Sequence, residues 1–137
     1  MRSSFLLILL IIFTNCSSTR EEQSNPIIDE FFNSFNHQNS DKAIDYLFST
    51  NEWIKKDDPH VLKLKEDIAK TINALGDYYG YEQVSTETMG NNLTQYEFLL
   101  KFDVQPLRFT ITLYKPFTEW QVQNFHYDYN FIEELKK

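Results

Sequence analysis

The sequence has very little cysteine, no cluster of basic residues and no hydrophobic run long enough to cross a bilayer. Only 1 of the 137 residues is cysteine, which excludes an internal disulfide framework because a bridge needs two thiols. Serine elbows, phosphate-binding loops, nucleotide fingerprints and CxxC or HxxxH spacings are also absent. No cofactor and no metal are therefore expected.

Positive charge is scarce. The chain has 13 Lys and Arg against 20 Asp and Glu, a formal net charge of −7. The pair Lys55-Lys56 is followed at once by Asp57-Asp58. An acidic surface repels phosphate backbones, so nucleic acid is not an expected partner.

The one cysteine follows a short apolar segment. Arg2 precedes the run FLLILLIIF at residues 5–13, which suits a secretory signal and is too short to span a bilayer. The whole segment resembles a bacterial lipoprotein signal, and the resemblance implies that Cys16 is lipidated and becomes the first mature residue. The open alternative is an ordinary signal peptide in which Cys16 is incidental. We expect a signal peptide at 1–15, a flexible tether at 16–25, one domain at 26–137, and export to the bacterial cell envelope, at the outer membrane or its periplasmic face.

Three helices are predicted first. Asn25 and Pro26 begin one with an apolar face of isoleucines and phenylalanines, and Ser40 caps a shorter one at about 41–48. Asp58 and Pro59 begin the longest, which ends at Gly76. Its apolar residues form one stripe, Val61, Leu64, Ile68, Ile72 and Leu75. Between the last two helices, Trp53 and Ile54 are expected to anchor the connection to the core.

Four strands follow, at about 79–89, 93–102, 107–114 and 120–129. In the second and third, large apolar residues alternate with polar ones, which is typical of an antiparallel sheet with one wet face. The predicted fold class is α+β, with three N-terminal helices on a four-stranded antiparallel meander. We expect the long helix to lie across the buried sheet face, with Ile68, Ile72, Phe98 and Ile111 almost fully buried.

This order of elements, ending in RFTITLYKPFTEWQVQNFHYDY, resembles the nuclear transport factor 2-like superfamily over about residues 26–129. The superfamily includes ketosteroid isomerases, polyketide cyclases and small bacterial lipoproteins. The resemblance implies a cone-shaped, cystatin-like fold whose curved sheet wraps the long helix, and dimers through the outer sheet face, where Leu99, Thr110, Thr112 and Tyr114 would lie. It implies no particular function, because such folds host enzymes and binding modules alike.

An enzyme of this kind needs a carboxylate base and a donor inside the cone, but the inner positions of the second and third strands hold no carboxylate. The last strand holds the alternative. Side chains alternate between the two faces of a regular strand, which would put Trp120 and Val122 on one face and Phe125 and Tyr127 on the other. Only a β-bulge near 123–124 lets all four face the core. We predict the bulge, with His126 and Asp128 facing solvent, because burying two large aromatic side chains is more favourable than burying a His and an Asp. Without a bulge, His126 and Asp128 would point into the cone as a base and its orienting partner.

The expected function is a membrane-anchored envelope lipoprotein that binds a protein partner or a small apolar ligand without catalysis. Tyr79, Tyr81 and Tyr96 would form the rim of any pocket. The alternative is an isomerase- or cyclase-type enzyme that uses His126 and Asp128.

Overall fold

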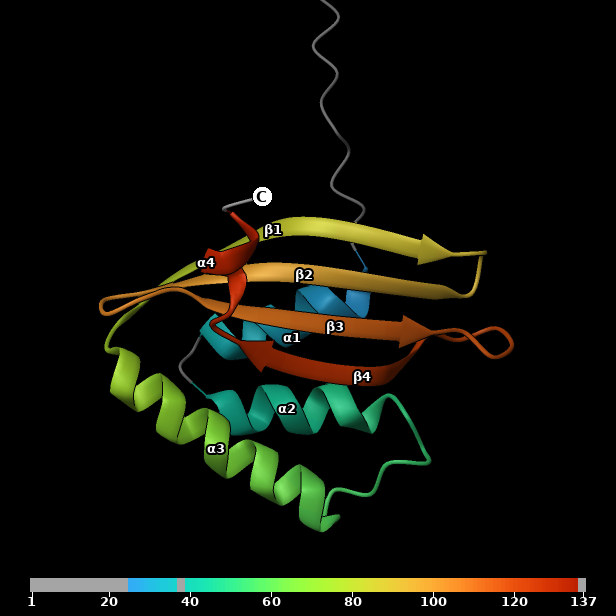
Figure 1. Ribbon diagram of the computed structural model, residues 1–137. Helices are drawn as coiled ribbons and strands as arrows, with labels where there is room; N and C mark the ends of the chain where they lie inside the picture. The colour runs from blue at the N-terminus through green and yellow to red at the C-terminus, as the bar shows by residue number, and fades with distance from the viewer. Residues whose placement is uncertain (1–24, 37–38, 136–137) are drawn as a thin grey trace, which may run out of the picture.

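The computed structural model describes residues 25–36 and 39–135 of the chain, and its elements follow the order helix, helix, helix, then a sheet (Figure 1). The α+β fold class is confirmed. The segment 1–24, which contains the predicted signal and Cys16, and residue His37 lie outside the described residues. The elements are α1 (Pro26–Asn36), α2 (Ser40–Ser49), α3 (Pro59–Leu75), β1 (Tyr78–Met89), β2 (Leu93–Phe102), β3 (Leu107–Tyr114), β4 (Gln121–Asp128) and α4 (Phe131–Glu134).

Local signals set the helix starts. The side chain of Asn25 accepts a hydrogen bond from the backbone of Ile27 at 3.0 Å, and Asp58 caps α3 in the same way with Pro59 in its first turn. The cap of α2 is Asn39, one residue before the predicted Ser40, because the Asn39 amide oxygen accepts from the backbone of Lys42 at 3.0 Å.

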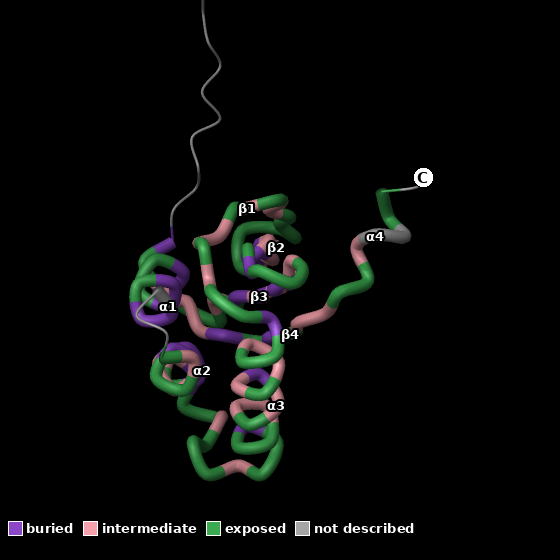
Figure 2. Tube along the Cα trace, turned by 90° about the vertical axis from the view of Figure 1, so that its left-hand side faces the viewer, coloured by how far each residue is buried: buried purple, intermediate pink, exposed green. Residues whose placement is uncertain are grey.

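The four strands form one antiparallel meander in the order β1-β2-β3-β4. The inner face of β2 and β3 is apolar and fully buried, as the alternation predicted. Helices α1 and α2 lie on this inner side of the sheet, while the short α4 lies on the outer side (Figure 2).

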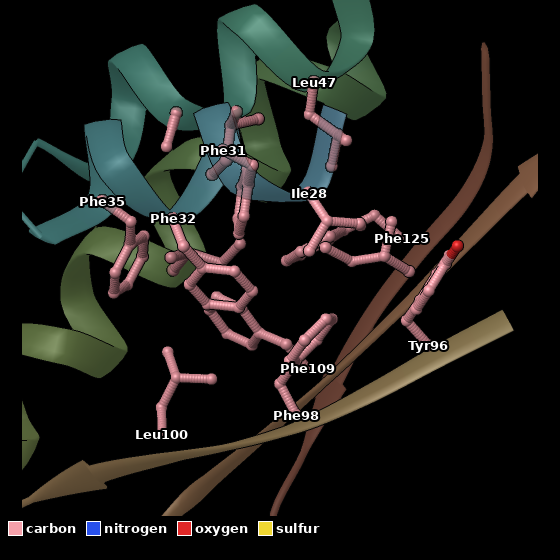
Figure 3. Close-up of a cluster of buried hydrophobic side chains, with 14 of the residues drawn as sticks. Ile28, Phe31, Phe32, Phe35, Leu47, Tyr96, Phe98, Leu100, Phe109 and Phe125 are labelled. Atoms are coloured by element: carbon pink, nitrogen blue, oxygen red, sulfur yellow. The ribbon is translucent and has the colours of Figure 1, made fainter. Parts of the chain in front are cut away.

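The helix that fills the inner face is α1, and the expectation for α3 was wrong. Phe31 of α1 is 0% exposed and its ring lies 6.2 Å from that of Phe109 and 6.0 Å from that of Phe125. Figure 3 shows Phe31 pointing from α1 toward Phe109 and Phe125 of the sheet. Helix α3 lies past the β4 edge, next to α2, in both views (Figures 1 and 2). The rings of α1 bury large apolar surfaces and meet those of the sheet in edge-to-face and tilted contacts.

The predicted bulge in the last strand is confirmed. Thr112 pairs with Asn124 and the next residue, Leu113, pairs with Val122, so Gln123 is the extra residue. The slip lets four side chains of the last strand and its approach pack against the core, namely Trp120, Val122, Phe125 and Tyr127.

Two side-chain predictions were wrong. Trp53 is 82% exposed, although Ile54 packs against the core as predicted. Asn51 also anchors the connection, by donating from its buried side chain to the carbonyl of Val122 at 2.7 Å. Ile72 is only partly buried, whereas Ile68 is 0% exposed.

Candidate functional site

A cleft of about 500 Å³ opens where four elements meet: the end of α1, the start of α2, the last two turns of α3 and the start of β1. We call it the distal cleft. Its size falls in the range of small-molecule and peptide sites. It is lined by Phe35, Asn39, Ser40, Asp41, Ala69, Ile72, Asn73, Gly76, Asp77 and Tyr78.

One wall of the distal cleft is fixed by the turn from α3 into β1. Gly76 has a φ of 86° and a ψ of −151°, a conformation that only glycine adopts readily. After the turn, the carboxylate of Asp103 accepts the backbone N–H of Asp77 at 2.7 Å and the hydroxyl of Tyr79 at 2.6 Å. Leu75 accepts the backbone N–H of Val104 at 3.1 Å. These bonds hold the α3 end against the β2–β3 loop.

The distal cleft combines an apolar base with polar and acidic groups. Phe35 and Ile72 supply apolar surface, while Asp41 and Asp77 are exposed. The hydroxyl of Tyr78 is buried and has no hydrogen-bond partner within the described part of the chain. Burial raises the pKa of Tyr78, so the phenol stays protonated at neutral pH and keeps a donor to offer. Such a site suits a neutral or cationic guest with an apolar body.

A second polar group lies on the outer sheet face, around Arg108. Its guanidinium donates two hydrogen bonds to Asp128, at 3.1 and 3.0 Å, and one to Glu134 of α4 at 2.8 Å. Glu97 lies 4.0 Å away. The Asp128 side chain is 10% exposed. Burial works to raise the pKa of Asp128, but hydrogen bonds from Arg108 and from the backbone of Asn130 outweigh it and leave the pKa lowered. This cluster fastens α4 to the sheet.

Arg108→Met is expected to reduce the free energy of unfolding by about 1–3 kcal/mol at neutral pH, since it leaves a buried carboxylate without its partner. Because the pKa of Asp128 is lower in the folded than in the unfolded protein, its carboxylate stabilises the fold at pH values above the unfolded pKa of about 3.9. This contribution is lost as the pH falls through the folded pKa. The deficit of the variant should therefore shrink on acidification. Urea unfolding at several pH values measures it.

Lys101→Met is the matched control, because the Lys101 ion pair with Glu82, at 3.1 Å, is exposed on the same sheet face. It should cost less than about 1 kcal/mol. A deficit of Arg108→Met that does not change with pH would contradict the role given to Asp128.

The residues of the alternative catalytic pair lie together, but outside the core. His126 and Asp128 both lie on the outer face, with 3.4 Å between His126 Nε2 and Asp128 Oδ2. The imidazole is 63% exposed, whereas the carboxylate is engaged by Arg108. The bulge thus places this pair away from the inner face, as the pattern of the last strand favoured.

The predicted rim tyrosines do not meet around one opening. Tyr96 is 4% exposed and belongs to the core. Tyr81 stacks on Phe32 with 3.8 Å between ring centroids, and Tyr79 is exposed and bound to Asp103. The distal cleft is lined by Tyr78 instead. Its residues come from four elements with no shared spacing, so no sequence signal could have assembled them.

The outer face of the sheet carries the four residues predicted to lie there, namely Leu99, Thr110, Thr112 and Tyr114. Within residues 25–36 and 39–135, no group of His, Cys, Asp and Glu side chains is arranged to hold a metal. No helix in the same ranges is both long and apolar enough to cross a bilayer.

In comparisons with protein-family models, curated proteins and solved structures, none matches this chain.

Proposed function

We propose that the protein is a lipid-anchored envelope lipoprotein whose domain binds a guest in the distal cleft without catalysis. The observation that carries the binding role is the cleft itself, with its apolar base and the unpartnered hydroxyl of Tyr78. A buried donor without a partner costs about 1–3 kcal/mol, and a small rearrangement that turned the Tyr78 hydroxyl into the cleft would let an acceptor on the guest recover this free energy. The phenylalanines of α1 fill the inner sheet face. The distal cleft is therefore the better candidate for a binding site.

The guest is a small molecule or a segment of a partner protein. Asp41 and Asp77 at the cleft favour a neutral or cationic guest over an anion. The family resemblance to nuclear transport factor 2-like domains stays part of the proposal, supported by the order of three helices before a four-stranded meander.

The binding role is tested by placing a photo-crosslinking amino acid at Asn73 in the full-length protein, in cells. We expect an adduct with a partner segment, or a defined mass increase for a small guest. Asn73 is exposed and lines the distal cleft. Lys70 lies one turn earlier on α3, with its side chain 69% exposed and outside the cleft, and serves as the matched control position. Equal labelling at both positions, or none at Asn73, would contradict a cleft guest.

The anchor is tested separately at Cys16. Cys16→Ser is expected to abolish incorporation of a fatty-acid probe and to move the protein out of the membrane fraction, since stable anchoring needs the acyl chains. Ser17→Ala, next to it, should label like the parent protein. Continued labelling of Cys16→Ser would overturn the lipid anchor and leave the binding role untouched.

A further inference from the structure

Three loops meet at the end of the molecule opposite the distal cleft. They are the α2–α3 loop, the β1–β2 turn and the β3–β4 hairpin (Figure 1). The backbone N–H of Val122 donates to the hydroxyl of Thr50 at 3.0 Å, which joins the start of β4 to the α2–α3 loop. The backbone N–H of Lys115 donates to the carbonyl of Asn92 at 2.8 Å, which joins the hairpin to the β1–β2 turn. We call this end the tether end.

The N-terminal part of the described chain lies at the same end. Asn25 bonds through its side chain to Tyr96, which lies three residues after the start of β2 at the β1–β2 turn. Helix α1 begins on the side of the three loops and runs away from them (Figure 1). The described chain therefore begins in the half of the domain that carries the three loops (Figure 1).

Each of the three loops holds out a large apolar side chain. Trp53 is 82% exposed, Phe117 is 88% exposed and Met89, at the end of β1, is 75% exposed. The backbone at Trp53 is held in place, because its N–H donates to the side chain of the buried Asn51 at 3.0 Å. Single exposed apolar side chains are common, but several large ones at one end of a domain indicate a contact surface.

We propose that the tether end rests on the lipid bilayer, with Trp53 and Phe117 in its interfacial region. This inference rests on the lipid anchor proposed at Cys16. Eight residues lie between Cys16 and Asn25, and a flexible linker of that length would span about 14–17 Å, so the proposed anchor would hold the start of the domain close to the lipid. Tryptophan and other aromatic side chains favour the membrane–water interface, where an apolar ring and a polar edge are both accommodated.

The charges of the tether end indicate that the contact is apolar. Basic and acidic residues alternate in the three loops and nearly cancel, namely Lys55, Lys56 and Lys115 against Glu52, Asp57, Asp58 and Glu119. A bilayer of zwitterionic lipid is therefore sufficient, and added salt should change the contact little. With the tether end on the lipid, the distal cleft faces away from the membrane.

The test uses the mature protein, purified from its membrane with its acyl chains and reconstituted in phosphatidylcholine vesicles. Trp120→Phe leaves Trp53 as the single tryptophan. Lipids brominated close to the headgroup should quench its emission roughly two-fold, since they place the quencher at the depth where tryptophan settles. Quenching of the Trp53 emission by iodide in the aqueous phase should be largely lost when vesicles are present.

The matched control carries Trp53→Phe, Trp120→Phe and Lys70→Trp, which moves the reporter to the exposed face of α3 on the same anchored protein. Brominated lipid should leave it unquenched. If Trp53 of the anchored protein is unquenched too, the inference is overturned while the anchor stands. If iodide loses access to Trp53 when the protein concentration is raised without lipid, the patch contacts a second copy of the protein. That result would also overturn the proposed bilayer contact. Purified protein without acyl mass would instead overturn the anchor.

Discussion

Phe31→Ala is expected to lower the free energy of unfolding by about 3–5 kcal/mol, the usual cost of removing a fully buried ring. Phe31 is 0% exposed and its ring lies within 6.2 Å of four others, on Phe32, Phe35, Phe109 and Phe125. The rings come from one helix and two strands, so the surrounding structure cannot close the void by moving one element. Small domains are stable by only about 5–15 kcal/mol, and the variant should unfold at a much lower urea concentration.

Phe117→Ala removes the same side chain from a hairpin tip where it is 88% exposed. It should change the stability by no more than about 0.5 kcal/mol. A loss below about 1 kcal/mol for Phe31→Ala would mean that α1 does not seal the inner sheet face.

Gly76→Ala is expected to cost about 3 kcal/mol, from a backbone penalty of about 1–3 kcal/mol and a steric one. The φ of 86° is unfavourable for alanine, and an added Cβ would lie 2.5 Å from Asp103 Oδ2 and 2.9 Å from Asp103 Cβ. Asp103 cannot move freely, because it accepts hydrogen bonds from Asp77 and Tyr79. The same substitution should alter the distal cleft, which Gly76 lines.

Gly90→Ala separates the two costs. Gly90 also has a positive φ, 62°, but an added Cβ would meet nothing within 4 Å. It should cost only about 1–2 kcal/mol. Adding Asp103→Gly to Gly76→Ala should recover part of the loss in a double-mutant cycle, because the side-chain atoms of Asp103 that the new Cβ would meet, its Oδ2, Cγ and Cβ, are then gone. Equal costs at Gly76 and Gly90 would show that Asp103 yields without a penalty.

The sequence patterns predicted the elements well because their signals are local. The ends of β2 and β3 were predicted to the residue, and the parity of Trp120 and Val122 against Phe125 and Tyr127 located the bulge. However, both α1 and α3 have an apolar face, and the sequence pattern alone does not show which of the two helices packs on the sheet. The phenylalanines of α1 interlock with Phe98, Phe109 and Phe125 of the sheet, and such contacts are a property of the assembled core.

The candidate site was less predictable. Trp53 was expected in the core because tryptophan carries the largest apolar surface, yet a polar residue, Asn51, holds its loop. The groups around the distal cleft come from residues as far apart as Phe35 and Tyr78, and none of them has the spacing of a known site. The Arg108 cluster joins β2, β3, β4 and α4, which only the register of the sheet brings together.

The position of Asn25 has a mechanical consequence. Asn25 is 8% exposed, begins α1 through its bond to Ile27 and bonds across to Tyr96 in β2. A force applied at Asn25 therefore acts directly on the first turn of α1, the helix whose rings fill the inner sheet face. Unwinding α1 from this end would uncover the core. We therefore expect the N-terminal end of the domain to resist a pulling force about as well as the core resists unfolding.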